Sequence, residues 1–227
     1  MTELTPKTLA GYFDHTLLRP NATDDEFRGL CDDSRSYGFA MVAVNSVQVS
    51  CCKKLLEGCG VHVGAAIGFP LGQTTIEAKL FETKDALNNG ADEIDYVVNL
   101  SRLQAKDYAY VEKEMRAITD ACRAKGATSK VILETCFLTD ELKREMCAIA
   151  MDVGIDYVKT STGFGTGGAT IEDIRLMKEC VGDKVKVKAS GGVRTLDFAL
   201  ELIDAGVSRI GSTASVKIVQ ELKARGN

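Results

Sequence analysis

The sequence repeats one unit along its whole length: a short run of β-branched and other apolar residues, followed by a longer amphipathic stretch. The apolar runs cover residues 11–16, 39–44, 61–67, 93–98, 130–134, 155–160, 185–189 and 209–211. Strict alternation of strands and helices favours parallel strands joined by right-handed crossovers. Eight such units in 227 residues predict an α/β protein, a single (β/α)8 TIM barrel that spans residues 1–227.

The stretches between the runs predict helices over 24–37, 75–89, 103–125, 139–153 and 196–205. Several of them stop just before a glycine, which favours the left-handed conformation that ends many helices. Thr139 and Thr170 are each followed by acidic residues, so they are expected N-caps.

Composition excludes several classes of protein. The chain has 28 Lys and Arg against 32 Asp and Glu, without a basic block, which gives no electrostatic case for nucleic acid. No apolar run approaches the roughly 18 residues of a membrane span. The first residues lack the apolar core of a signal peptide, so a cytoplasmic protein with reduced cysteines is expected. With only His15 and His62 available, a histidine-rich metal site is disfavoured.

In a (β/α)8 barrel the chemistry lies where the strands end, because the loops there surround one mouth. In the fourth strand, alternation directs Glu93, Asp95, Val97 and Asn99 to the interior. Asp14 lies inside the first strand, near its end, where a buried acid is costly unless it is paired or solvated. Asp14 is therefore expected to face the mouth, either as part of the site or as a structural carboxylate that holds a loop.

Lysines on the sixth and seventh strands are the counterpart of these acids. Lys159 lies deep in an apolar run, and Lys188 lies on the interior face of the next strand with Lys186. Burial and a neighbouring positive charge both lower a lysine pKa, and a lysine of lowered pKa attacks carbonyls to give a Schiff base. Asp95 is suited to move protons in such a reaction. The alternative is a structural ion network that neutralises Glu93, Asp95 and Glu134.

Small and glycine residues follow the last three strands, where barrels commonly bind phosphate through backbone N–H groups. Residues 163–168 also match the GxGxxG pattern of dinucleotide-binding proteins, but they follow the sixth strand, and the next strand ends in Lys-Ala-Ser rather than an acid. A loop beside the nucleophile is the better interpretation. Arg194 either adds charge to the phosphate site or pairs at the surface. The candidate phosphate segments are 190–194 and 211–213, with 162–163 as a third.

Several segments carry a further signal when they are taken together and in order. They are 14–18 (Asp-His-Thr-Leu-Leu), 67–72 (Ile-Gly-Phe-Pro-Leu-Gly), 91–99, 130–135, 157–164 (Tyr-Val-Lys-Thr-Ser-Thr-Gly-Phe), 187–194 (Val-Lys-Ala-Ser-Gly-Gly-Val-Arg) and 209–213. In this order they resemble the deoxyribose-phosphate aldolases, a family of class I, Schiff-base aldolases with a TIM barrel. The resemblance covers nearly the whole chain.

The resemblance implies reversible cleavage of 2-deoxy-D-ribose 5-phosphate to D-glyceraldehyde 3-phosphate and acetaldehyde, with no metal or organic cofactor. Lys159 matches the family's Schiff-base lysine, and Lys188 matches the second lysine that perturbs it. Asp95 matches the proton-relay acid, and Asp14 a supporting group. The predicted phosphate residues, which fall where the family holds the phosphate, are Gly163, Gly191, Gly192, Arg194, Ser212 and Thr213. Relatives are often dimers or tetramers, so a homo-oligomer is expected, with a small phosphosugar as the other partner.

Two departures from the family pattern are visible. Ala43 stands where many relatives carry a cysteine, so inactivation by aldehyde trapping of a thiol is expected to be weaker. The sequence ends at Asn227 without the tyrosine-bearing tail of some relatives, so transfer of the methyl proton of acetaldehyde is expected to be less efficient. A phosphosugar isomerase or decarboxylase, or a non-catalytic phosphosugar-binding barrel, are the alternatives.

Overall fold

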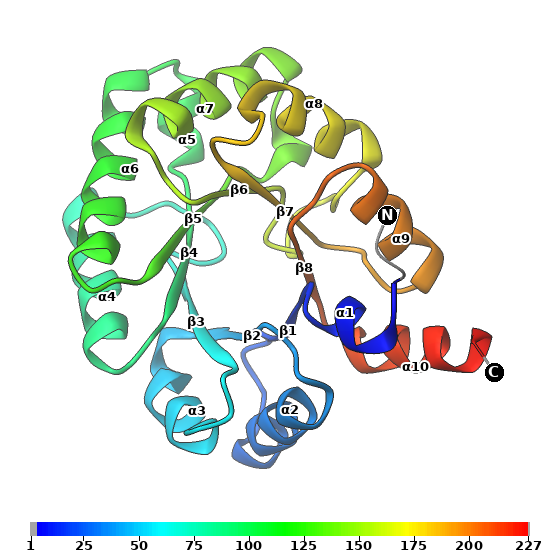
Figure 1. Ribbon diagram of the computed structural model, residues 1–227. Helices are drawn as coiled ribbons and strands as arrows, with labels where there is room; N and C mark the ends of the chain where they lie inside the picture. Colours follow the sequence, from blue (N-terminus) through cyan, green and yellow to red (C-terminus); the bar gives the residue numbers. More distant parts are fainter. Residues whose placement is uncertain (1–3, 227) are drawn as a thin grey trace.

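The computed structural model describes residues 4–226, and its strands close into one barrel (Figure 1). Each strand pairs in parallel with the next in the sequence, and the last pairs with the first. The predicted (β/α)8 barrel is therefore confirmed. The strands are β1 (Phe13–Leu17), β2 (Met41–Asn45), β3 (His62–Ile67), β4 (Glu93–Val97), β5 (Thr128–Ile132), β6 (Tyr157–Lys159), β7 (Lys186–Ser190) and β8 (Arg209–Ser212).

Helices surround the barrel as an outer layer (Figure 1). The helices predicted over 24–37, 75–89, 139–153 and 196–205 are present, each within one residue of the predicted bounds. Thr139 and Thr170 both accept a backbone hydrogen bond as N-caps. The helices are α1 (Pro6–Ala10), α2 (Asp24–Tyr37), α3 (Val49–Leu55), α4 (Ile76–Asn88), α5 (Leu100–Gln104), α6 (Tyr108–Arg123), α7 (Asp140–Val153), α8 (Ile171–Val181), α9 (Leu196–Asp204) and α10 (Ser215–Arg225).

The prediction of a single helix over 103–125 is wrong, because a turn interrupts the helix between α5 and α6. Lys106 has a φ of 57°, a left-handed conformation that a continuing helix cannot accommodate. The Asp107 side chain then accepts a hydrogen bond from the Tyr110 backbone N at 3.2 Å and caps α6. Neither glycine nor proline marks this turn, so the sequence pattern gave no sign of it.

Asn99 is also misplaced by the sequence pattern. β4 ends at Val97, so alternation between the two faces of the sheet stops before Asn99. Its side chain accepts a hydrogen bond from the Arg102 backbone N at 3.1 Å and caps α5 instead of pointing into the barrel.

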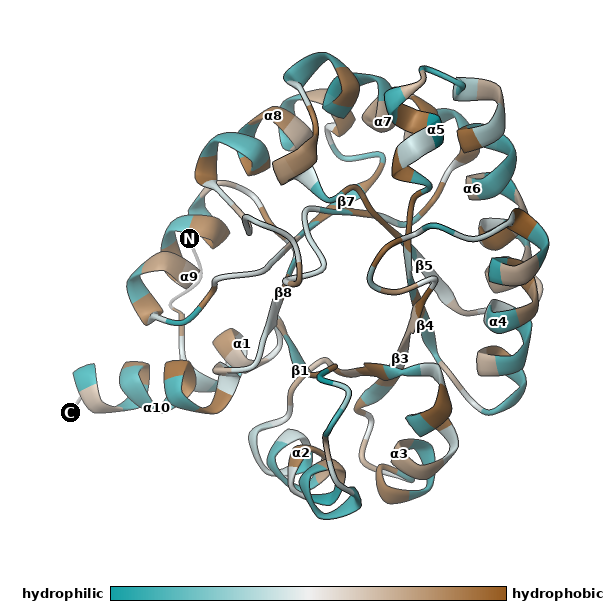
Figure 2. Cartoon of the chain, turned by 180° about the vertical axis from the view of Figure 1, so that it is seen from behind, coloured by the Kyte–Doolittle hydropathy of each residue, from teal (hydrophilic) through white to brown (hydrophobic). Residues whose placement is uncertain are grey.

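The apolar core lies between the barrel and the helices. Outward-facing strand residues such as Val42, Ile94 and Val158 are fully buried in it. Figure 2 shows the strands largely brown or white, whereas the outer helices alternate between brown and teal. The helices therefore bury one apolar stripe against the sheet and present a polar one to solvent.

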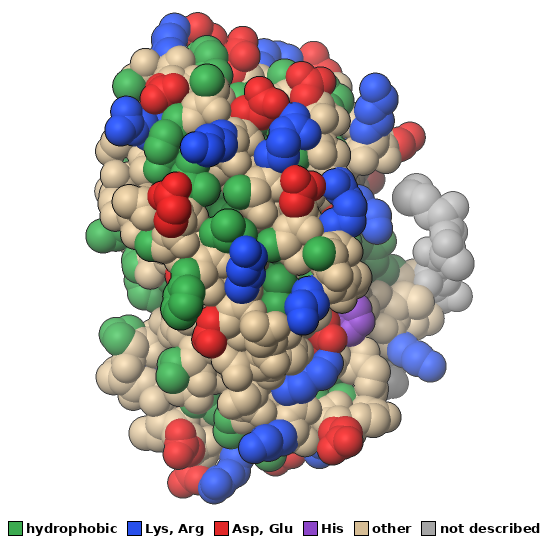
Figure 3. Space-filling view, turned by 90° about the vertical axis from the view of Figure 1, so that its left-hand side faces the viewer, with side chains coloured by type: hydrophobic (Ala, Val, Ile, Leu, Met, Phe, Trp, Pro, Cys, Tyr) green, Lys and Arg blue, Asp and Glu red, His purple; other side chains and the backbone are tan. Residues whose placement is uncertain are grey.

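The outer surface is mixed in charge on the face that Figure 3 shows, where blue and red side chains are interspersed. Within residues 4–226, no helix is long and apolar enough to cross a membrane.

A buried ion pair fixes the end of β4 to the helix layer. The Lys79 ammonium on α4 donates to the Glu114 carboxylate on α6 at 2.6 Å and to the Val97 carbonyl at 2.7 Å. The Asn99 backbone N donates to the other Glu114 oxygen at 2.9 Å. Lys79 and Glu114 are both fully buried, so each charge depends on the other for its stabilisation.

We expect Lys79→Met to lower the free energy of unfolding by about 3 kcal/mol, because it leaves the Glu114 carboxylate buried without a counter-charge. Glu112→Gln on the same helix is the control. It breaks an exposed pair with Arg116 and should cost less than about 1 kcal/mol. Urea unfolding followed by circular dichroism measures both, and equal losses in the two variants would contradict this account.

Candidate active site

The carboxyl ends of the strands place the two predicted lysines side by side. Lys159 is the last residue of β6, and its register partner on β7 is Lys188. Both side chains are buried, with 4 % and 0 % exposure. Because register partners on adjacent strands lie on the same face of a sheet, both amines point into the barrel.

Asp95 of β4 is the carboxylate on which these lysines converge. It accepts hydrogen bonds from Lys159 at 2.7 Å and from Lys188 at 2.5 Å. Asp14 of β1 joins the group, because the Lys188 Nζ also lies 2.5 Å from an Asp14 oxygen. The structure thus brings together all of the predicted Schiff-base, perturbing and proton-relay residues.

Two further cations complete the cluster, and sequence reasoning gave them no role. Lys130 of β5, fully buried, donates to Asp95 at 2.8 Å and pairs with Glu93. Arg209 of β8 donates to Asp14 at 2.7 Å and to Glu93 at 3.2 Å. Both residues begin an apolar run, a position that is typical of a solvent-facing strand start. β5, however, begins two residues earlier, at Thr128, which places Lys130 well inside the barrel.

Two other residues lie apart from the cluster. Glu134 takes no part in the ion network: its carboxylate accepts hydrogen bonds from the Thr162 backbone N, at 3.2 and 3.3 Å, and from the Thr162 hydroxyl. Lys186 stays exposed at the start of β7, with its Nζ 5.5 Å from the centre of the Tyr157 ring.

The surroundings set the protonation of the central groups. Burial lowers the pKa of Lys159 to about 8; Asp95 opposes this shift and Lys188 adds to it. Burial alone acts to raise the pKa of Asp95, but Lys130, Lys159 and Lys188 outweigh it and hold that pKa well below its usual range. At neutral pH Asp95 is therefore a carboxylate, while a useful fraction of Lys159 is free amine.

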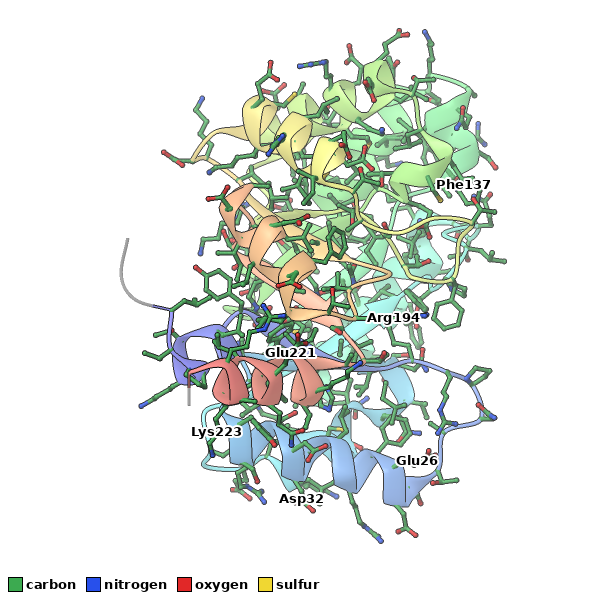
Figure 4. All side chains as sticks on the ribbon, turned by 90° about the vertical axis from the view of Figure 1, so that its right-hand side faces the viewer. Glu26, Asp32, Phe137, Arg194, Glu221 and Lys223 are labelled. Atoms are coloured by element: carbon green, nitrogen blue, oxygen red, sulfur yellow. The ribbon has the colours of Figure 1, made fainter. Side chains whose placement is uncertain are left out.

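One cavity of about 750 Å³ lies above the cluster, and Lys159 forms part of its wall. Figure 4 shows Arg194 on the same side of the molecule as Glu26 and Phe137, while Glu221 and Lys223 of α10 lie toward the other end. Arg194 is exposed. All the predicted phosphate residues line this cavity: Gly163, Gly191, Gly192, Arg194, Ser212 and Thr213.

Close backbone contacts give this part of the mouth its shape. Gly191 has a φ of 84°, and a Cβ there would lie 3.0 Å from the Cα of Gly168. A Cβ on Gly168 would lie 2.3 Å from the Gly191 carbonyl oxygen. The Ser212 hydroxyl donates to the Val193 carbonyl at 2.7 Å and accepts from the Ala214 backbone N at 2.9 Å. The loops after β6, β7 and β8 are therefore tied together.

Fold and site together define a class of protein. A lysine of lowered pKa, buried beside a carboxylate and open to a cavity at the mouth of a (β/α)8 barrel, is an arrangement suited to an enzyme that acts through a lysine imine. Comparison with known proteins gives the particular group. The model of the DeoC/LacD family aldolases matches residues 8–212, and the chain belongs to this family.

Individual relatives agree with this assignment. The chain is 51 % identical to a deoxyribose-phosphate aldolase of Bacteroides thetaiotaomicron, over 98 % of this chain and 94 % of that protein. It is 49 % identical to one of Thermococcus kodakarensis, over 94 % and 96 %. Among solved structures, the tetrameric deoxyribose phosphate aldolase of Aeropyrum pernix superposes with a TM-score of 0.90 at 34 % identity, covering 97 % of this chain and 93 % of that one.

We expect Lys188→Met to raise the pKa of Lys159 by roughly one unit, because a neighbouring positive charge is lost and Asp95 is shared by fewer cations. A higher pKa leaves less free amine at neutral pH. Imine formation with acetaldehyde, trapped by borohydride and quantified on Lys159 by mass spectrometry, should fall by roughly tenfold at pH 7 and recover above about pH 10.

Lys186→Met is the matched control for this variant. It removes an ammonium group from the same strand, but one that lies exposed over Tyr157. Its pH profile should match that of the unmodified protein. An unchanged profile in Lys188→Met would show that the Lys188 ammonium does not contribute to the reactivity of Lys159.

Proposed function

We propose that this protein catalyses the reversible cleavage of 2-deoxy-D-ribose 5-phosphate to D-glyceraldehyde 3-phosphate and acetaldehyde, with Lys159 as the nucleophile. The observation that carries the proposal is the buried Lys159 amine, with a pKa lowered to about 8, 2.7 Å from Asp95 at the wall of the mouth cavity. The names of the relatives at about half identity support this choice of substrate.

In the first stage the free Lys159 amine adds to the C1 aldehyde of the open-chain sugar. One proton moves from nitrogen to the former carbonyl oxygen and gives a carbinolamine. A second proton, delivered from the Lys188 ammonium through Asp95, lets this hydroxyl leave as water and forms an iminium ion. Asp95 and Lys188 are placed to hold and return these protons. The Asp95 carboxylate accepts a hydrogen bond from the Lys159 amine, and Lys188 donates to the same carboxylate.

In the second stage the C2–C3 bond breaks. The C3 hydroxyl gives up its proton and becomes the aldehyde of D-glyceraldehyde 3-phosphate, while the electron pair of the broken bond moves through C1 to the nitrogen and forms an enamine. Protonation at C2 regenerates an iminium ion. Water then adds to it and releases acetaldehyde and the Lys159 amine.

The substrate phosphate is proposed to lie against the loops that follow β6, β7 and β8. The residues proposed to contact it supply mainly backbone N–H groups, and α10 begins directly after Ala214 with no side-chain cap on its first turn. Unpaired N–H groups at a helix start favour an anion. Arg194 adds a positive charge at the rim.

The setting of the enzyme is also part of the proposal. We infer one catalytic domain over residues 1–227, located in the cytoplasm and assembled as a homo-oligomer, either a dimer or a tetramer. The tetrameric Aeropyrum pernix relative supports the larger assembly, and size-exclusion chromatography with light scattering distinguishes the two.

Borohydride reduction in the presence of acetaldehyde should add a stable two-carbon mass to Lys159. Lys159→Ala should reduce cleavage of the sugar phosphate by roughly 10⁴-fold or more, since the proposed nucleophile is lost, while inorganic phosphate still binds. A folded protein with an unmodified Lys159 would instead favour the isomerase or decarboxylase, which needs no imine. Phosphosugar binding without turnover would identify a binding protein.

Gly191→Ala tests the proposed phosphate site separately from the chemistry. The new methyl group meets Gly168, and the positive φ is strained. We therefore expect the KM for the sugar phosphate to rise by roughly tenfold, while trapping of acetaldehyde on Lys159 stays within about twofold. Gly126→Ala is the matched control, because Gly126 also has a positive φ (67°) but open space around it. Equal KM changes in the two variants would argue against a phosphate site here.

A further inference from the structure

Charged side chains stay in contact from the mouth of the barrel to the opposite end, where the strands begin. Lys159 donates to Asp95 at 2.7 Å, and Lys130 donates to the same carboxylate at 2.8 Å. Lys130 also pairs with Glu93, and a Glu93 oxygen lies 2.8 Å from the Nδ1 of His62. In this series of contacts, the side chains of Lys159, Asp95, Lys130 and Glu93 are all at least nine-tenths buried.

His62 is the link that reaches solvent. It is the first residue of β3, and its side chain is 53 % exposed, against 2 % for the Glu93 side chain. The hydrogen bond to Glu93 raises the pKa of His62 above its ordinary value, while burial opposes the shift. The protonated imidazole is therefore favoured more than in a histidine without such a partner.

Other charged groups face His62 from every element around it. Arg209 of β8 contacts the same Glu93 oxygen at 3.2 Å. Asp92, directly before β4, is held by Lys53 of α3 at 2.6 Å. Lys54 and Glu57 line the shallow hollow beside the imidazole. Asp92 therefore has a cation of its own, whereas Glu93 is shared among several.

Two carboxylates at different depths compete for one lysine. Glu93 is shared by His62, Arg209 and Lys130, and Asp95 is shared by Lys130, Lys159 and Lys188. When His62 gains a proton, it neutralises more of the Glu93 charge. The Lys130 ammonium then interacts more strongly with Asp95. The attraction between Asp95 and the Lys159 ammonium becomes weaker.

We propose that His62 is a positioning residue for the imine chemistry: through Glu93 and Lys130, its protonation at the base of the barrel loosens the hold of Asp95 on Lys159 at the mouth. The consequence is that free amine persists at Lys159 below neutral pH. This inference rests on Lys159 being the reactive amine of the proposed function.

His62→Gln keeps a hydrogen-bond donor for Glu93 but cannot gain a charge. Acetaldehyde trapping on Lys159, measured from pH 5.5 to 9, should fall about twofold to threefold below that of the unmodified protein at pH 6, as expected for one charge acting over roughly 10 Å or more. The two proteins should agree at pH 9, where neither carries a positive charge at position 62.

Lys53→Gln is the matched control. It also removes a positive charge beside His62, but that charge pairs with Asp92 outside the chain of contacts to Lys159. Its trapping profile should change little. An equal loss at pH 6 in both variants, or a ratio that does not vary with pH, would overturn the proposal.

The coupling has a second readout that requires no chemistry at Lys159. Coupling between two titrating sites is reciprocal. Lys159→Met should therefore raise the pKa of His62 by about 0.3 to 0.5 units. NMR titration of the imidazole measures this pKa, and the spectrum of His62→Gln assigns the signal. An unchanged His62 pKa would overturn the inference even where imine forms. Absence of imine with a shifted His62 pKa would instead contradict the proposed function and leave the coupling intact.

Discussion

The contact on which the rest of the site depends is the Asp95 carboxylate, which accepts hydrogen bonds from three lysines inside the barrel. A single carboxylate cannot neutralise three ammonium groups. Lys130 has Glu93 as a second partner, and Lys188 has Asp14. Lys159 has no second carboxylate among the ion pairs of residues 4–226, so its proton is the one held least firmly. The lowered pKa of Lys159 thus follows from how partners are distributed, as well as from burial.

This arrangement limits where the fold can gain stability. Many barrels fill their interior with layers of branched apolar side chains, whereas here a large part of that space holds ion pairs, whose net contribution to stability is small. The apolar core between strands and helices must therefore supply most of the favourable free energy. The Lys79–Glu114 pair lies in that outer layer and fixes the end of β4. It is thus one of the contacts that hold the strand bearing Asp95 in register.

The barrel, Lys159, Lys188 and Asp95 could be predicted because period-two alternation within a clearly apolar run decides which face a side chain occupies. Lys130 and Arg209 could not be given a role, because a charged residue at the start of a run fits solvent and interior equally well until the strand boundary is known. The turn at Lys106 was missed because a lysine takes the left-handed conformation there, and no glycine marks the position. Local pattern thus located the reacting groups better than their supporting counter-charges.

In the proposed reaction the substrate phosphate introduces about two further negative charges close to the buried lysines and carboxylates. An anion next to Lys159 would favour its ammonium form and work against attack on the aldehyde. The proposed phosphate site avoids this conflict, because its charge is answered by backbone N–H groups, the start of α10 and Arg194 at the rim. The buried lysines are then left to Asp95, Glu93 and Asp14. The close approach of the loops at Gly168 and Gly191 depends on glycine, since a Cβ at either position would meet the backbone of the other loop.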